Sequence, residues 1–313
     1  MCTVTGDGGS GSFNHVIYSN TAGLDLAELS WDFFQLFTLT GDSPVFQINA
    51  GHAGAWFNPE TPGQGQLIDV EPESKFLFLS WFTFTDAASA NPSEQHWFTA
   101  QGNYLGDTAD LVVYETLGGQ FDGPQEVSND AVGDATLSFS DCGSGQLAYT
   151  IEPWDLQGSF PLQRAIAGTE NVCEERAGIS NEPLELNDGR DGAWFDEATP
   201  GQGFLIDAHP GDDFIFVAWF TYGEDTASGQ RWLTAQGPVE GSTADMVVYE
   251  TVGGSFDEPK PSETNAVGTM TIDFTDCSKA LLTYSITDEA LAGMIDIERA
   301  IPGTEALCEE LTQ

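Results

Sequence analysis

Apolar and polar residues alternate with a period of two along most of this chain, which is the pattern of half-buried β-strands. The stretch 293–301 shows it most clearly, because Ile295, Ile297, Arg299 and Ile301 share one face. Turn signals such as TPGQG and VEGST separate segments of this kind. In the second half of the chain they predict eight strands and no helix, near 192–196, 203–209, 213–222, 230–237, 244–252, 268–276, 280–287 and 293–301.

The chain contains two copies of one unit. GAWFNPETPGQG at 54–65 returns as GAWFDEATPGQG at 192–203, and VVYETLGGQFD at 112–122 returns as VVYETVGGSFD at 247–257. The offset is 192 − 54 = 138 for the first pair and 247 − 112 = 135 for the second, so one loop is three residues shorter in the second copy. This repetition divides the chain into an N-terminal tether with an aromatic-rich segment, a first repeat, a linker and a second repeat, at 1–43, 44–176, 177–181 and 182–313.

Eight short strands within about 120 residues suit an antiparallel up-and-down barrel, which closes on itself and leaves no exposed strand edge. The predicted fold class is therefore all-β, with two tandem eight-stranded antiparallel β-barrels. Each barrel needs its last strand to pair with its first.

Closure predicts a specific contact for one pair of basic residues. Arg164 and Arg299 are the only basic residues that recur at matching positions, and each lies on the apolar face of the last strand. A buried guanidinium is costly without a partner, and the face of an indole ring is a suitable one. Because closure brings the first strand alongside, we expect Arg164 to stack on Trp56 and Arg299 to stack on Trp194.

The combination of a G-x-W motif on a first strand with an Arg on the last strand resembles the structural signature of the calycins, the lipocalin and avidin barrels. The longer pattern GAWFNPETPGQG…LIDV…WFTF…HWFTAQG…YETLGGQFD…FSDC…NVCEE resembles modules found in one or two copies in predicted secreted proteins of marine and related proteobacteria. The first resemblance implies a calycin-like barrel. The second implies a secreted modular protein and no particular activity.

Four of the five cysteines predict disulfides. Cys142 and Cys173 are 31 residues apart, and so are Cys277 and Cys308, which suggests one bridge in each repeat. A loop of that size contributes roughly 3.5 kcal/mol of stability in the chain-entropy model. Disulfides form in oxidising compartments, so they favour a secreted or cell-surface protein.

The N-terminal residues and the net charge bear on whether the protein is secreted or held at the cell surface, and on its partners. Cys2 precedes a Gly/Ser-rich tether, as in a mature lipoprotein, although a free or paired thiol fits the sequence equally well. No apolar run of about 18 residues occurs, so no membrane-spanning helix is expected. The net charge of −42, from 50 acidic and 8 basic residues, excludes nucleic acid and bare anionic lipid as partners. The acidity could equally reflect a saline environment.

Catalytic motifs are absent from the sequence. No histidine occurs at the same position in both repeats, so neither a Ser-His-Asp triad nor a histidine metal site is duplicated. There is also no G-x-S-x-G, H-E-x-x-H, Walker or C-x-x-C motif. We therefore expect a protein that is not an enzyme.

Several polar residues recur in both copies and are the candidate ligand-binding residues. Turn capping, buried hydrogen bonding and solvated faces are the simpler explanation of such residues, and spacing alone does not exclude a glycosidase-like carboxylate pair. Acid-rich loops could bind Ca²⁺, although they lack the regular ligand spacing of an EF-hand. No other cofactor is expected. The ten residues are Gln64, Asp69, Gln101, Glu115, Asp122, Gln202, Asp207, Gln236, Glu250 and Asp257.

Two segments are unusually rich in aromatic residues. The third strand of each repeat, KFLFLSWFTF and DFIFVAWFTY, is apolar on both faces, so its outer face must meet the sister barrel, the N-terminal segment or a partner. The segment 24–39 has no clear period and favours either packing on a barrel or self-assembly.

These features predict a non-catalytic binding or adhesion protein that is secreted or lies at the cell surface. Its partner would be an extracellular glycan, a small apolar ligand or a protein. The alternative is a structural subunit of an extracellular assembly or filament, and a hydrolase acting on a secreted polymer comes third. A barrel filled by apolar side chains would favour a scaffold, whereas an open barrel end lined by Trp and carboxylates would favour binding or hydrolysis.

Overall fold

The structure is a computed structural model that describes residues 3–6, 9–12, 46–85, 93–178, 189–209, 213–223, 229–287 and 289–312. The chain forms two units, Met1–Val45 and Phe46–Gln313. In the first unit, β1 (Thr3–Gly6) and β2 (Gly9–Ser12) form a two-stranded antiparallel sheet. Cys2 and the aromatic segment 24–39 lie outside the described residues.

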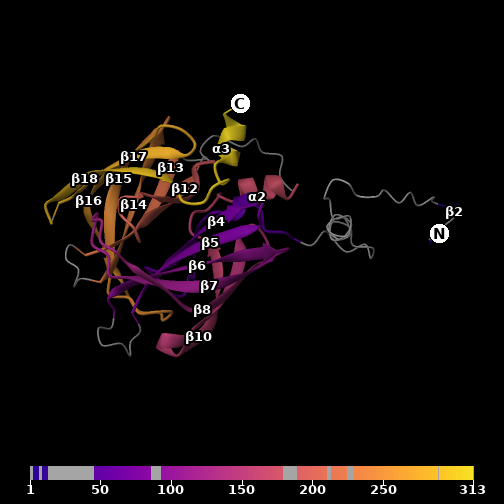
Figure 1. The fold of residues 1–313 in the computed structure, drawn as a ribbon, viewed down its shortest axis with the longest axis horizontal. Helices are drawn as coiled ribbons and strands as arrows, with labels where there is room; N and C mark the ends of the chain where they lie inside the picture. Colours follow the sequence, from indigo (N-terminus) through magenta and orange to yellow (C-terminus); the bar gives the residue numbers. More distant parts are fainter. Residues whose placement is uncertain are drawn as a thin grey trace. The chain divides into compact units, whose positions relative to one another are not determined.

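The second unit contains two closed antiparallel barrels of eight strands each, which confirms the predicted fold class (Figure 1). In the first barrel the last strand, β10, pairs with the first, β3, through Arg164 opposite Trp56. Its strands are β3 (Gly54–Phe57), β4 (Gly65–Glu71), β5 (Phe76–Phe84), β6 (Gln95–Leu105), β7 (Thr108–Leu117), β8 (Ser128–Phe139), β9 (Ser144–Ile151) and β10 (Leu156–Arg164).

The second barrel repeats this topology and closes through Arg299 opposite Trp194. Compared with the strands expected from alternation, β16 begins earlier, because its first residues extend the ladder with β15. The strands are β11 (Gly192–Phe195), β12 (Gly203–His209), β13 (Phe214–Tyr222), β14 (Gln230–Glu240), β15 (Thr243–Val252), β16 (Glu263–Phe274), β17 (Lys279–Ile286) and β18 (Leu291–Arg299).

The expectation of no helix inside a repeat is wrong. A six-residue helix follows the last strand of each barrel, α2 (Asn171–Arg176) and α3 (Ala306–Leu311), and 3₁₀ turns occur at η1 (Ala50–His52) and η2 (Glu152–Trp154). Each helix carries the second cysteine of a disulfide. Fewer than two turns give too little of the 3.6-residue period to register in the sequence.

The predicted disulfides are present. Cys142–Cys173 and Cys277–Cys308 each join Cα atoms 5.7 Å apart. In both repeats the helix packs closely on the segment before the first strand. A Cβ added at Gly51 would lie 2.0 Å from the backbone nitrogen of Cys173, so only glycine fits there. Each bridge therefore ties the end of its repeat to the closed end of its own barrel.

Buried side chains fill the interiors of both barrels. The interior of the first is a continuous cluster of buried apolar residues around Trp56 and Trp81, and that of the second surrounds Trp194 and Trp219. Among the described residues, neither barrel therefore contains an open ligand chamber.

The two arginines lie where alternation predicts. The Arg164 Cζ lies 4.3 Å from the Trp56 ring centroid, and the Arg299 Cζ lies 4.4 Å from that of Trp194. Arg164 also donates to the backbone carbonyl oxygens of Cys142, Ala53 and Gly51. Burial lowers the pKa of both guanidinium groups from its usual value, but three carbonyl partners and an indole face compensate for the lost water.

We expect Arg299→Ala to destabilise the protein by about 3–5 kcal/mol, because it empties a buried site and leaves carbonyl groups without donors. Arg299→Lys should recover only part of this loss, since an ammonium cannot span the same carbonyls. Urea denaturation followed by tryptophan fluorescence measures both. A loss below about 1 kcal/mol would contradict a structural role for the stack.

Arg176 is the matched control, because its side chain is 34% exposed and pairs with Glu310 on the surface. Arg176→Ala should cost less than about 0.5 kcal/mol. Arg231 cannot serve as this control, because it is 8% exposed and bound to two carboxylates.

Candidate binding site at the seam between the barrels

The two barrels pack against each other through the outer faces of their third strands. Phe82 and Phe84 of β5 meet Phe220 and Tyr222 of β13 in a buried cluster, with the Phe82 and Phe220 ring centroids 6.2 Å apart. Of the three partners that the sequence leaves open for this face, the sister barrel is therefore the one that covers it. The second apolar face of each third strand is an interface within the chain.

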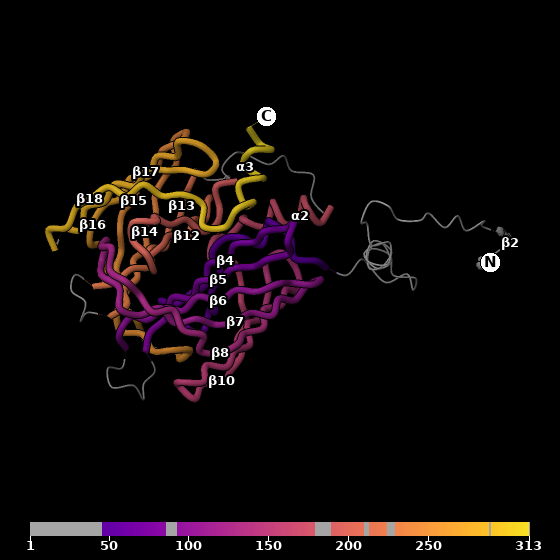
Figure 2. The backbone as a smooth tube through the Cα atoms, in the orientation of Figure 1, coloured from indigo at the N-terminus to yellow at the C-terminus, as the bar shows by residue number. Residues whose placement is uncertain are grey.

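Each barrel receives an aromatic plug from the other repeat. Phe256, in the segment after β15, lies among the core residues of the first barrel, 5.0 Å from Trp81 between ring centroids. Phe121, in the segment after β7, lies in the second barrel, 4.8 Å from Trp219. Figure 2 shows both segments reaching across to the other barrel.

Hydrogen bonds fix the plugs, and they involve four of the ten recurring polar residues. Tyr149 donates to Asp257 over 2.6 Å, and Tyr284 donates to Asp122 over 2.5 Å. Gln64 donates to the Ser255 carbonyl, and Gln202 accepts from the backbone N–H of Asp122. Asp122, Asp257, Gln64 and Gln202 thus hold one repeat to the other.

Gln95 and Gln230 occupy the same position in the two repeats, but the sequence analysis did not include them among the candidate residues. Gln230 accepts from the Trp97 N–H over 2.9 Å, and Gln95 accepts from the Trp232 N–H over 3.2 Å. Each amide also donates across the interface, Gln95 to Thr251 and Gln230 to Thr116. Recurrence at the 135-residue offset was the available signal.

Asp69 and Asp207 are buried in the interface. Asp207 accepts from the Ala55 N–H and Asp69 from the Ala193 N–H, each over 2.8 Å and each from the other repeat. Burial raises the pKa of both carboxyl groups to about 6, against the smaller opposing effects of those amides and of Arg299 or Arg164.

This contact explains the glycine of the GAWF motif. Gly54 has φ of +114° and Gly192 has φ of +127°, a region that side chains rarely adopt. A Cβ at Gly54 would also lie 2.9 Å from the Asp207 carboxylate. The motif therefore serves both barrel closure and the approach of the sister barrel.

The remaining four recurring residues are Glu115, Glu250, Gln101 and Gln236. Glu115 Oε1 is 2.9 Å from His96 Nε2, and Glu250 Oε1 is 2.9 Å from Arg231 Nε. His96 and Arg231 therefore occupy equivalent positions beside equivalent glutamates. Gln101 and Gln236 are exposed and lie directly opposite Phe78 and Phe216 on the neighbouring strands.

A hollow of about 560 Å³ lies along one seam between the barrels. The second barrel contributes Phe214, Phe216, Gln236 and His209, and the first contributes the segment 165–167 that follows β10. Both phenylalanines are only partly buried. A smaller hollow of about 170 Å³, which Phe78 and Trp97 help to line, lies between the repeats on the opposite seam. The larger hollow is the candidate binding site.

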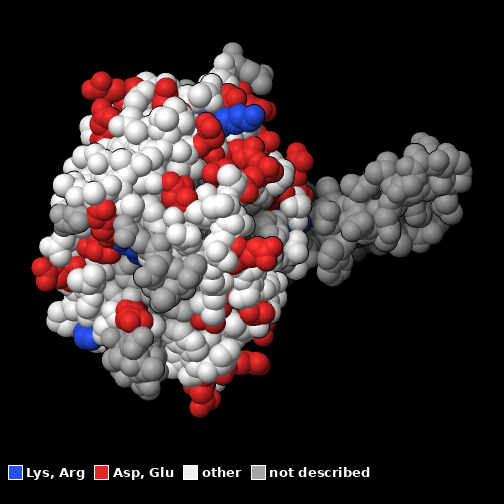
Figure 3. Space-filling model, turned by 60° about the vertical axis from the view of Figure 1, so that its left-hand side comes forward, with Lys and Arg blue, Asp and Glu red and all other residues white. Residues whose placement is uncertain are grey.

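The surface of the protein is acidic (Figure 3). On the face drawn in Figure 3, Asp and Glu are widely spread and Lys and Arg form a few isolated spots. Among the described residues, no group of three or more His, Cys, Asp or Glu side chains is arranged to hold a metal ion. No helix in the described part of the chain is long and apolar enough to cross a membrane.

In comparisons with known proteins, no protein-family model and no curated protein matches the chain.

The raised pKa of Asp69 and Asp207 predicts that the protein becomes less stable between about pH 4 and pH 6. The folded protein keeps these protons until about pH 6, whereas the unfolded chain releases them near pH 3.8. Their contribution is therefore fully present below pH 3.8 and is lost as pH rises through 6. A shift of about two pKa units corresponds to about 3 kcal/mol for each group.

Urea denaturation at several pH values tests this in wild type and in Asp69→Asn/Asp207→Asn. The amides keep the shape and the acceptor oxygen but do not titrate, so the difference between the two curves isolates these groups from the other acids. Parallel curves for the two proteins would contradict the prediction.

Phe256→Ala should cost about 3–5 kcal/mol, because it opens a cavity in the core of the first barrel. Phe121→Ala should do the same in the second barrel. The change in tryptophan fluorescence and the free energy of unfolding report the loss. Leu117→Ala, at a side chain that is 41% exposed, is the control and should change stability by less than about 0.5 kcal/mol. Equal effects of the plug and control variants would refute the plug role.

Proposed function

We propose that this chain is a non-catalytic, secreted or cell-surface binding protein that holds a neutral carbohydrate in the seam hollow between its barrels. The observation that carries the proposal is the pair Phe216 and Gln236, which lie opposite each other on neighbouring strands and line this hollow. The same pair recurs as Phe78 and Gln101 in the first barrel.

The chemistry of this pair suits a sugar ring. A sugar presents apolar C–H faces and a rim of hydroxyl groups. Phe214 and Phe216 offer partly exposed aromatic faces, and the exposed Gln236 amide offers both a donor and an acceptor. Binding sites typically combine an apolar lining with a few polar groups of this kind.

The charge of the protein limits the class of carbohydrate that the hollow can bind. The hollow has no Lys or Arg in its lining, and the whole chain carries a net charge of −42. Anionic polysaccharides would therefore meet repulsion without a compensating cation. A neutral polymer avoids this repulsion, and the second aromatic–glutamine pair could engage another part of the same polymer.

Other features support an extracellular, non-catalytic role. The two disulfides suit an oxidising compartment. Six of the ten recurring polar residues bind the sister barrel: Gln64, Asp69, Asp122, Gln202, Asp207 and Asp257. These carboxylates are therefore engaged in holding the fold together.

A structural subunit of an extracellular assembly is the second candidate. The filled barrels favour it, and so do apolar side chains on the outside, where Met294 is 72% exposed and Leu105 is 61% exposed. Light scattering over a range of concentrations and salt would reveal such assembly.

We expect the wild-type protein to bind at least one member of a panel of neutral polysaccharides, measured by affinity electrophoresis and calorimetry. Phe216→Ala and Gln236→Ala should each weaken binding at least about tenfold, which corresponds to about 1.4 kcal/mol. Phe78→Ala should have a smaller effect, because its hollow is smaller.

Leu105→Ala, at an exposed outer residue away from both hollows, is the control and should leave binding unchanged. Thermal unfolding of each variant separates lost binding from lost folding. Absence of binding to every neutral polymer, or full binding by Phe216→Ala, would refute the carbohydrate site.

A further inference from the structure

The second barrel is closed by a short contact that leaves most of its last strand open on one side. β11 pairs with β18 only at Trp194 opposite Arg299 and Phe195 opposite Glu298. β18 continues back to Leu291, and over that length its described partner is β17 alone. One edge of residues 291–297 therefore has no strand beside it among the described residues.

The hydrogen bonds at the closure show which backbone groups face this open side. The Arg299 N–H donates to Ser278 on the β17 side, whereas the Ala300 N–H donates to Ala193 on the β11 side. Backbone N–H and C=O groups alternate in direction along a strand. Met294 and Asp296 therefore direct their N–H and C=O groups toward the open side, and both residues are exposed.

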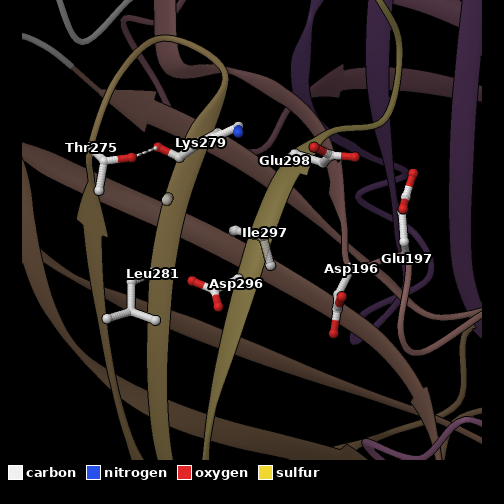
Figure 4. Close-up of a pocket in the computed structure, with 9 residues that line it drawn as sticks. Asp196, Glu197, Thr275, Lys279, Leu281, Asp296, Ile297 and Glu298 are labelled. Carbon is white, nitrogen blue, oxygen red and sulfur yellow. Dashed lines mark hydrogen bonds between the residues drawn. The ribbon is translucent and has the colours of Figure 1, made fainter.

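A hollow of about 330 Å³ lies at this edge, and its rim is acidic (Figure 4). Asp296 and Glu298 come from β18, and Asp196 and Glu197 from the segment after β11 lie across from them. Lys279 is the only basic residue in the lining. The hollow thus combines unpaired backbone with an excess of negative charge.

The first repeat blocks the equivalent edge. Arg164 and Arg299 are equivalent at an offset of 135, so Asp296 corresponds to Pro161 on β10. Proline has no N–H and disfavours pairing with an incoming strand, which is a common protection of exposed edges. The two barrels share one topology but differ at the residue that decides whether this edge can pair.

We propose that the open edge of β18 accepts an extended, basic segment of a partner protein as an added strand. Backbone hydrogen bonds to Met294 and Asp296 would hold the segment, as in other cases of strand addition. Asp296 and Glu298 lie on the outer face, since Ile295 and Ile297 fill the barrel core. Lys or Arg at every second position of the added strand would lie beside them.

The choice of occupant follows from charge. A second copy of this chain has 50 acidic and 8 basic residues and would bring like charge to an acidic edge. A basic extended peptide brings opposite charge and a free backbone edge. This site is separate from the proposed carbohydrate hollow, so either proposal can fail without the other.

The test uses the full-length protein and a fluorescent peptide of alternating Lys and Thr, with anisotropy as the readout. We expect one peptide per protein. Asp296→Pro, which copies the first repeat, should weaken binding at least about tenfold, whereas Asp296→Asn should weaken it only about two- to threefold. The same peptide with alternate backbone nitrogens methylated should lose binding, because it keeps its charge but not its donors.

Pro161→Asp provides the reciprocal variant and should create a second peptide site on the first barrel. Equal affinity of Asp296→Pro and Asp296→Asn, or equal binding of the methylated peptide, would show charge attraction alone and overturn the proposal. Self-association that Asp296→Pro abolishes would identify a second copy as the occupant and overturn it as well. If Asp296→Pro does not fold, the methylated peptide and Pro161→Asp still distinguish strand addition from charge attraction alone.

Discussion

The buried guanidinium on the closing strand is the interaction on which the rest of each barrel depends. Arg164 and Arg299 each cover the indole of the first strand, and each donates to carbonyls of the barrel's end segment. One of those carbonyls belongs to a disulfide cysteine, Cys142 or Cys277. A single side chain therefore joins strand closure, the end cap and the covalent bridge, and its loss would leave several buried polar groups unpaired at once.

The second level of organisation is the exchange of equivalent groups between the two repeats. Aromatic plugs, tyrosine–aspartate hydrogen bonds and glutamine amides all occur twice, once in each direction. Each barrel is completed by the other, since Phe256 and Phe121 belong to the core of the opposite barrel. Side chains of both repeats fill the interiors, and the hollows described above lie at the seams and at an outer edge.

The two copies also differ at residues that line hollows or exposed strand edges. The seam hollows differ in size, and the outer edge carries Pro161 in one barrel and Asp296 in the other. A duplicated unit can keep its packing residues in both copies and change a residue that packing does not constrain. The open edge of β18 and the larger seam hollow therefore each differ from their counterpart in the other copy.

The sequence by itself determined the repeat, the strand pattern, the disulfides and the stack of Arg164 and Arg299 on tryptophan. These follow from alternation, equal spacing and the cost of burying a cation, which act within one repeat. Only the tertiary structure decided that Asp69, Asp122, Gln64 and their counterparts bind the sister barrel, or that Phe256 fills the first. Those contacts join residues 79 or more positions apart. A recurring polar residue gives the same sequence pattern whether it contacts a ligand, water or another domain. Their role was set by which surfaces the two barrels bring together.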